Sequence, residues 1–285
     1  MGILGLRKRS ARARLARLLM TTELPTFPAL TLKVLEVIRE PEVEFDDIAA
    51  AIQWDPGLVM RLLTTVNSAA FSPRAPIENV HHAVSYLGKS QLEAMVIAVA
   101  VQGVLPDQAM RGFEPSRFWL ASARRAALAR AFATKIHPSS TGEAFTAGLL
   151  LDLAVPAMAA GLGDSYGELL EASLGGEAES LIELERSRLD TTHPEVGSLL
   201  AASWGLPERL ASNIGDHHTD GASLLPAVRL VAGLRETVSE GGEMQPEDEA
   251  MLELAREEFG LAPDWTVAAI GSSVQEAADL QRRLI

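Results

Sequence analysis

The sequence predicts an all-α fold, and three observations support this prediction. Apolar residues recur at helical spacing, as Leu58, Leu62 and Val66 do, so that they would share one face of a helix. Proline and glycine interrupt the chain at intervals of helical length, which is typical of helices joined by short connections. No stretch alternates between apolar and polar residues over the length of a strand, and no fixed-period repeat is present.

The chain begins with a basic segment, residues 1–22, for which we expect a leader helix or tail. Residues 1–20 contain no acid and six basic residues: Arg7, Lys8, Arg9, Arg12, Arg14 and Arg17. A solvated helix or tail is the simplest explanation of this charge. Two alternatives stay open: the segment could dock on an acidic partner or a membrane surface, or it could be attracted to the acidic C-terminal end of the chain.

Residues 23–110 form the amino-terminal half of the expected main domain, which runs from 23 to 240. Asp55 precedes a proline, and this order predicts a helix whose first free backbone groups Asp55 caps. Asn67 and Ser68 lie at the far end of that helix, where small polar side chains can bind the terminal backbone groups. Gly88 allows a left-handed turn between two buried helices.

Residues 114–240 form the second half of the main domain, and residues 241–285 form acidic C-terminal helices. Within the second half, the stretch Gly205-Leu206-Pro207 ends one helix and lets the next one begin. Twelve acidic residues stand against three arginines between residues 236 and 285, and we expect them to form a solvated face. The pattern does not decide whether these helices pack on the main domain or regulate access to it.

The composition excludes several classes of protein. Cysteine is absent, so neither a disulfide framework nor a thiolate metal site can form, which suits a reducing cytoplasm. The longest apolar run, from Ala94 to Val101, is far shorter than the roughly 20 residues of a membrane span, and no secretory signal follows the basic start. A net charge of −13 argues against nucleic-acid binding. We therefore expect a cytoplasmic protein without stable membrane insertion.

Three segments of the amino-terminal half together resemble the HDOD family, the HD-related output domains. They are LPTFP at 24–28, DPGL at 55–58 continuing into VNSAAF at 66–71, and AVSYLG at 83–88. The resemblance implies a multi-helix architecture in which an N-terminal helical bundle packs on a helical core like that of the HD superfamily. It also implies a role in bacterial signal transduction.

The second half resembles the HD superfamily of metal-dependent phosphohydrolases. The matching segments are FWLAS at 118–122, GLLLD at 148–152, HPEVG at 193–197 and the histidine pair at 217–218. The resemblance aligns three of the superfamily's metal ligands with Ala121, Leu151 and Gly233, none of which can donate an electron pair to a metal. The Gly-Tyr-Pro run of the HD-GYP branch is also absent, because Asp152 is followed by Leu-Ala-Val-Pro. The resemblance thus implies a protein that is not an enzyme and holds no metal or other cofactor.

Four residues that align with functional positions remain: Asp152, His193, His217 and His218. We expect a satisfied polar cluster, or alternatively a residual pocket for a small ligand or anion. His217 and His218 are adjacent on an expected helix, where side chains diverge by about 100°, so one ion is not expected to bind both. Arg124 and Arg125 share a helix with Ala121. Solvent exposure is the simpler expectation for these arginines, whereas contact with the phosphates of a nucleotide is the alternative that would add Arg124 to the pocket.

The leading hypothesis is therefore a non-catalytic regulatory module that acts through contacts with signalling proteins. Two alternatives are retained. One is a sensor that binds a small nucleotide without hydrolysing it, and the other is a degenerate metal-dependent phosphohydrolase. The input signal, the partner and the oligomeric state are not determined by the sequence.

Overall fold

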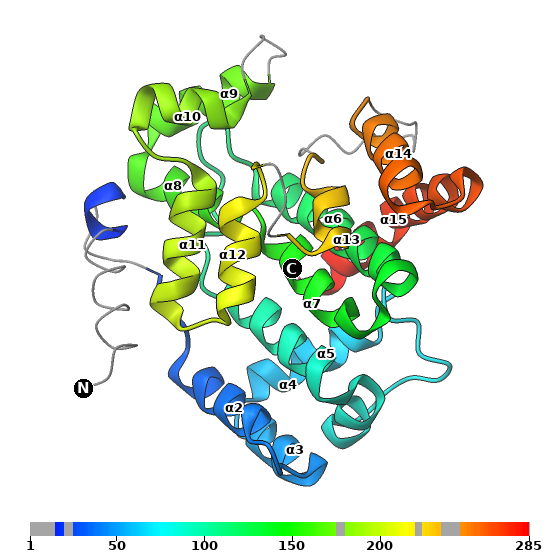
Figure 1. Cartoon of the computed structure of the whole chain (residues 1–285). Coiled ribbons are helices and arrows are strands. Elements are labelled where there is room, and N and C mark those ends of the chain that lie inside the picture. The colour runs from blue at the N-terminus through cyan, green and yellow to red at the C-terminus, as the bar shows by residue number, and fades with distance from the viewer. Residues whose placement is uncertain (1–14, 20–24, 175–179, 220–223, 235–245, 285) are drawn as a thin grey trace. The chain divides into compact units, whose positions relative to one another are not determined.

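The computed structural model describes residues 15–19, 25–174, 180–219, 224–234 and 246–284 (Figure 1). These residues form helices and connecting turns, and the part of the chain so described contains no β-strand beyond one isolated bridge between Met110 and Phe113. The predicted all-α fold is confirmed. The chain divides into two compact units. The first comprises Met1–Thr26, Leu105–Phe118 and Leu150–Leu225, and the second comprises Phe27–Val104, Trp119–Leu149 and Pro226–Ile285.

The second unit contains both the N-terminal helices and the C-terminal helices of the chain. Its helices are α2 (Ala29–Arg39), α3 (Phe45–Gln53), α4 (Pro56–Val66), α5 (Val80–Gln102), most of α6 (Pro115–Ile136), the 3₁₀ turn η1 (Pro138–Ser140), α7 (Thr141–Leu150), α13 (Pro226–Val231), α14 (Pro246–Phe259) and α15 (Pro263–Leu284). In this unit the predictions for Asp55 and Asn67 are confirmed, whereas the prediction for the Ser68 side chain is wrong, because its hydroxyl is buried without a hydrogen-bond partner among the described residues. The Asp55 carboxylate accepts a hydrogen bond of 3.0 Å from the backbone N–H of Leu58 at the start of α4. The Asn67 side chain ends α4 by bonding the Leu63 carbonyl and both backbone groups of Ile77.

Gly88 divides α5 into two helical segments. Its φ of +67° lies in the left-handed region that residues other than glycine rarely adopt, so the predicted turn is confirmed.

Two apolar stretches of the chain bear on membrane insertion. By length and composition the stretches Val80–Gln102 and Pro138–Leu162 could cross a membrane, but 61% and 78% of their most apolar windows are buried inside the protein. Core helices of soluble proteins show the same property, so these two stretches are weak grounds for a membrane span.

The acidic C-terminal helices pack within the second unit. One face of α14 and α15 is buried, including Met251, Ala255, Ile270 and Leu280. At the C-terminal end of α4, the Asp279 carboxylate of α15 accepts a hydrogen bond of 2.7 Å from the backbone N–H of Ala69. The acidic residues therefore belong to amphipathic helices with an apolar inner face.

The first unit contains the helices that carry the candidate site. They are α8 (Ala154–Leu162), α9 (Asp164–Leu174), α10 (Leu181–Leu189), α11 (His193–Trp204) and α12 (Glu208–Asp216). As predicted, Gly205 ends α11 and Pro207 precedes α12. The two helices approach closely because Gly197 has no side chain: a Cβ atom there would lie 2.7 Å from Ile214 Cγ2. This approach holds the start of α11 near the end of α12.

Candidate functional site

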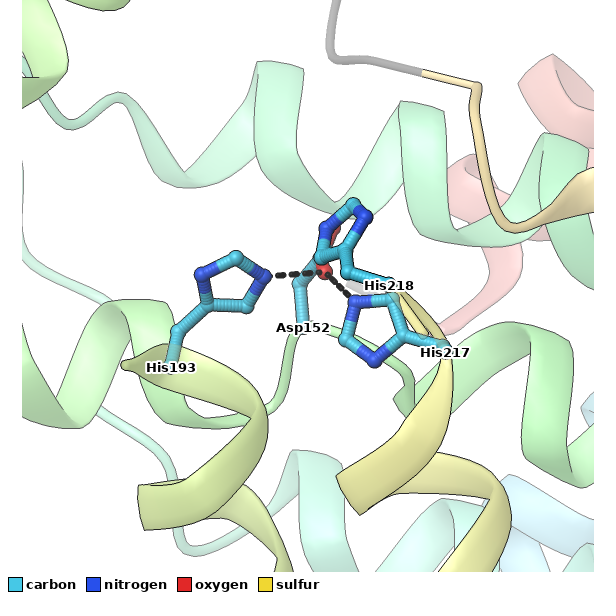
Figure 2. A group of neighbouring side chains, drawn as sticks. All are labelled: Asp152, His193, His217 and His218. Atoms are coloured by element: carbon cyan, nitrogen blue, oxygen red, sulfur yellow. Dashed lines mark ion pairs between the residues drawn. The ribbon is translucent and has the colours of Figure 1, made fainter. Parts of the chain in front are cut away.

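Asp152, His193, His217 and His218 converge in the first unit, and we refer to them as the His/Asp cluster (Figure 2). Asp152 lies in the turn that precedes α8, His193 is the first residue of α11, and the two adjacent histidines follow the last residue of α12. Each of the four residues offers one potential ligand atom, and these atoms all lie within 4.8 Å of one another. The fold thus gathers three separate turns around a single point.

The Asp152 carboxylate lies at the centre of the cluster. Its Oδ1 atom is 3.4 Å from His193 Nε2 and 3.2 Å from His217 Nε2, as the dashed lines in Figure 2 indicate. Both distances exceed the 2.7–2.9 Å that is usual for a charge-assisted N–H···O bond. They do match the edge of a tetrahedral zinc site, which is about 3.3 Å for metal–ligand bonds of about 2.0–2.1 Å.

His193 is held by a second, buried carboxylate. Glu185 Oε2 accepts hydrogen bonds of 2.8 Å from both the backbone N–H and the Nδ1 atom of His193. Glu185 Oε1 accepts a bond of 2.6 Å from the Tyr166 hydroxyl. Glu185 is completely buried and sits between helices α9 and α11. This arrangement directs His193 Nε2 towards Asp152, as outer carboxylates do for metal-binding histidines.

The same carboxylates alter the protonation of His193. Burial lowers the pKa of the imidazole, but the hydrogen bonds to Asp152 and Glu185 outweigh it and raise the pKa to about 9. In the metal-free protein His193 is therefore cationic at neutral pH. Its charge is balanced by the two carboxylates on either side of the ring.

His217 is oriented by the backbone of α12. Its Nδ1 atom lies 2.7 Å from the Ile214 carbonyl oxygen, and because a carbonyl only accepts, Nδ1 carries the proton. Nε2 then faces Asp152. This buried Nε2 lies 3.2 Å from Asp152 Oδ1 and has no hydrogen-bond partner of normal geometry among the described residues. An orphaned ring nitrogen of this kind is suited to binding a metal ion.

The expected divergence of the His217 and His218 side chains is not observed. Their ring centroids lie 4.2 Å apart, and both residues offer a nitrogen to the cluster. The angle of 100° applies to Cα–Cβ bonds within a continuous helix. Here α12 ends at Asp216, and the ring nitrogens lie at the end of adjustable side-chain torsions. The four residues together therefore form a group of donors that could hold a metal ion.

Arg124 belongs to the second unit, whereas the four residues of the cluster belong to the first. The expected solvent exposure of Arg124 and Arg125 is wrong, because both are buried in α6. Arg124 donates to Asp248 of α14 at 2.7 Å and to Ser273 of α15 at 3.3 Å. The C-terminal helices thus supply the polar partners that burial of this guanidinium requires.

The three positions that lack a metal donor are divided between the units. Leu151 precedes Asp152 in the first unit and is buried. Ala121 is buried in α6, and Gly233 is exposed in the turn after α13; both belong to the second unit. Sequence reasoning missed Glu185 and Tyr166 altogether. Glu185 lies in the charged helix LIELERSRL, where nothing local distinguishes it from Glu183, which caps the same helix.

Comparison with known proteins identifies the family. The family model for the HDOD domain matches residues 24–220, which is more than half of the chain. This protein belongs to the HDOD family. The resemblance seen in the sequence motifs is confirmed, and the matched range ends before α13, α14 and α15.

Solved structures share the HDOD fold along nearly the whole chain. An HDOD domain protein of unknown function from Geobacter sulfurreducens has a TM-score of 0.72 at 24% identity, with 96% of this chain and 99% of that chain covered. A Shewanella amazonensis protein provisionally named a phosphohydrolase has a TM-score of 0.73 at 20% identity, with 97% and 98% covered. A Marinobacter aquaeolei protein provisionally named a signal transduction protein has a TM-score of 0.68 at 17% identity, with 97% and 65% covered. At these identities the comparison establishes the fold alone.

A sequence relative is an uncharacterised protein of Treponema pallidum (strain Nichols). It is 28% identical over 200 residues, which are 69% of this chain and 38% of that protein. The HDOD chain therefore corresponds to well under half of this larger relative.

Proposed function

We propose that this HDOD protein is a signalling module that does not hydrolyse phosphoesters and acts through contacts with other proteins. The observation that carries the proposal is the composition of the His/Asp cluster. It offers four protein ligands around one point, whereas the neighbouring Leu151 offers none. Hydrolysis would require an ion with a position left open for water or substrate.

A closed coordination shell separates structural metal sites from catalytic ones. Structural zinc is bound by four protein ligands, whereas catalytic zinc has three and keeps its fourth position for water. We propose that all four members of the His/Asp cluster, whose donor atoms now lie within 4.8 Å of one another, would close around one cation by small side-chain movements and leave it no position at which to activate water. When bound, such an ion would tie the turn before α8 to the start of α11 and the end of α12. It would stabilise the fold without chemistry.

Transmission of a signal then has to use the surface of the helices. A structure with the same fold carries the provisional name of a signal transduction protein, which is in keeping with a regulatory role. The family's output function supports the same proposal. We place this protein among modules that pass on a state by binding a partner.

A degenerate phosphohydrolase is the second candidate, because the convergence of Asp152 with three histidines favours metal binding. The two candidates differ in turnover. We would measure hydrolysis of bis(p-nitrophenyl) phosphate, nucleotides and cyclic dinucleotides with and without Mn²⁺, on the wild type and on Asp152→Ala. Our proposal expects both proteins to show the same background rate. Metal-dependent turnover that disappears in Asp152→Ala would overturn it.

Metal content would be measured in parallel, on protein purified without chelator or affinity tag. A closed site predicts at most one zinc ion per chain, lost in Asp152→Ala and retained in His137→Ala. His137 is an exposed histidine outside the cluster, so the second variant controls for adventitious binding. Two or more tightly bound ions per chain would favour hydrolytic metal chemistry instead.

The nucleotide sensor has lost part of its support. The guanidinium of Arg124, which was expected to meet phosphates in that hypothesis, is buried and paired with Asp248. A cation already bound to a carboxylate within its own unit is not presented to a ligand. The buried pair of Arg124 and Asp248 therefore argues against a nucleotide sensor that uses this arginine.

A further inference from the structure

Helices α3 and α4 and the turn between them expose large apolar side chains. Trp54 is 79% exposed, Met60 is 65% exposed and Phe45 is 41% exposed. Trp54 and Met60 have the highest exposures among the large apolar residues that the structure describes. Single exposed apolar residues are ordinary, but a group of them on adjacent helices is typical of an interaction site.

Trp54 lies at the end of one exposed face of α3, whereas Met60 belongs to α4. Asp46, Asp47, Ala50, Gln53 and Trp54 are all exposed and follow the helical spacing of three and four residues along α3. The opposite face buries Ile48, Ala49 and Ile52 in the second unit, where α3 contacts α2, α4 and α5. Figure 1 shows α3 beside α2. The helix is thus anchored by its inner face and presents a mixed acidic and aromatic outer face.

The same stretch carries concentrated negative charge. Residues 40–60 contain no lysine or arginine and six acids: Glu40, Glu42, Glu44, Asp46, Asp47 and Asp55. Asp55 caps α4, and Asp46 forms an exposed ion pair with His81 at 2.7 Å. Glu40, Glu42, Glu44, Asp46 and Asp47 are exposed, and we refer to these five acids together with the exposed Trp54 and Met60 as the acidic α3 surface. Its charge repels nucleic acids and anionic membranes.

We propose that the acidic α3 surface docks a basic amphipathic helix of a partner protein. Trp54 and Met60 would contact the apolar residues of that helix, because tryptophan is favoured as an anchor in protein interfaces. The surrounding carboxylates would pair with its lysines and arginines and would accelerate association. Lysine or arginine could also lie against the exposed indole face. The inference deepens and rests on the proposed signalling function, since it names the chemical class of the partner.

The test uses the full chain and a synthetic helix of leucine and lysine, with leucine on one face and lysine on the other. Binding would be followed by titration calorimetry. We expect Trp54→Ser to weaken binding by about tenfold or more, a change of about 1.4 kcal/mol. Val267→Ser, which removes another exposed apolar side chain on α15, should leave the affinity unchanged. Equal affinities for the wild type and Trp54→Ser would overturn the proposal.

A second pair of variants separates this surface from the protein's overall acidity. Glu42→Lys with Glu44→Lys should weaken binding by about tenfold. Glu249→Lys with Glu253→Lys changes the net charge equally on exposed positions of α14 and should have little effect. Equal losses in the two double variants would show that attraction is non-specific and would refute the assignment. Hydrolysis assays are independent of these measurements, so failure here leaves the non-hydrolytic proposal standing and failure there leaves the docking result intact.

Discussion

Replacing Glu185 with glutamine tests how the candidate site is held together. The carboxylate is completely buried and accepts three hydrogen bonds, one from Tyr166 and two from His193. Glutamine has nearly the same shape, so no cavity forms, but it removes the charge and turns one acceptor into a donor. Hydrogen bonds to a charged group contribute about 1.5–3 kcal/mol, against about 0.5–1.5 kcal/mol for neutral ones. Weakening two or three of them should lower the free energy of unfolding by about 3 kcal/mol.

Urea denaturation of the metal-free protein at neutral pH would measure this loss. With an m-value of about 2 kcal/mol/M, the midpoint should fall by about 1.5 M. Glu168→Gln is the matched control, because Glu168 is an exposed partner of Arg111 in the same unit, and its loss should cost less than about 1 kcal/mol. If Glu185→Gln and Glu168→Gln lowered the midpoint equally, the hydrogen-bond network would not stabilise the first unit as we describe.

Three further predictions concern His193, the buried Arg124 pair and metal binding at the His/Asp cluster. The pKa of His193 is raised from 6.5 to about 9, so the stability that its protonation contributes in the metal-free protein is fully present below pH 6.5 and is lost as pH rises towards 9. Urea midpoints measured across this pH range should reveal a loss of about 3 kcal/mol in the free energy of unfolding. A midpoint that does not change with pH would contradict the charge balance described for His193. Asp248→Ala leaves Arg124 buried without its carboxylate and should lower the free energy of unfolding by about 3–5 kcal/mol. Glu257→Ala breaks an exposed pair with Arg256 and should lower it by less than about 1 kcal/mol in the same assay. Similar losses in the two variants would contradict the packing of α14. Zinc at about a hundred times its dissociation constant should stabilise the wild type by about 2.7 kcal/mol in thermal unfolding and should leave Asp152→Ala unchanged; equal stabilisation of both would place the ion elsewhere.

Interactions between close neighbours in the chain could be predicted well. The Asp55 cap, the turn at Gly88 and the break at Gly205 depend on a few consecutive residues, whose backbone preferences and hydrogen-bonding groups are visible in the sequence. The four members of the His/Asp cluster were also identified in advance, through the family resemblance of the segments that contain them. Their mutual geometry could not be predicted, because it depends on where α12 ends, and this helix ends at Asp216, directly before the histidine pair.

Long-range contacts decided the remainder. Arg124 was expected in solvent and is buried, since its partner Asp248 comes from a helix beyond the family match. Glu185 was overlooked because its importance comes from Tyr166 and His193, which reach it from two other helices. The sequence by itself thus determined the helices, their ends and the residues available for chemistry, because these follow from local backbone preferences and side-chain type. Only the tertiary structure decided which charges are buried and which donors meet at one point, because those properties depend on how separate helices pack.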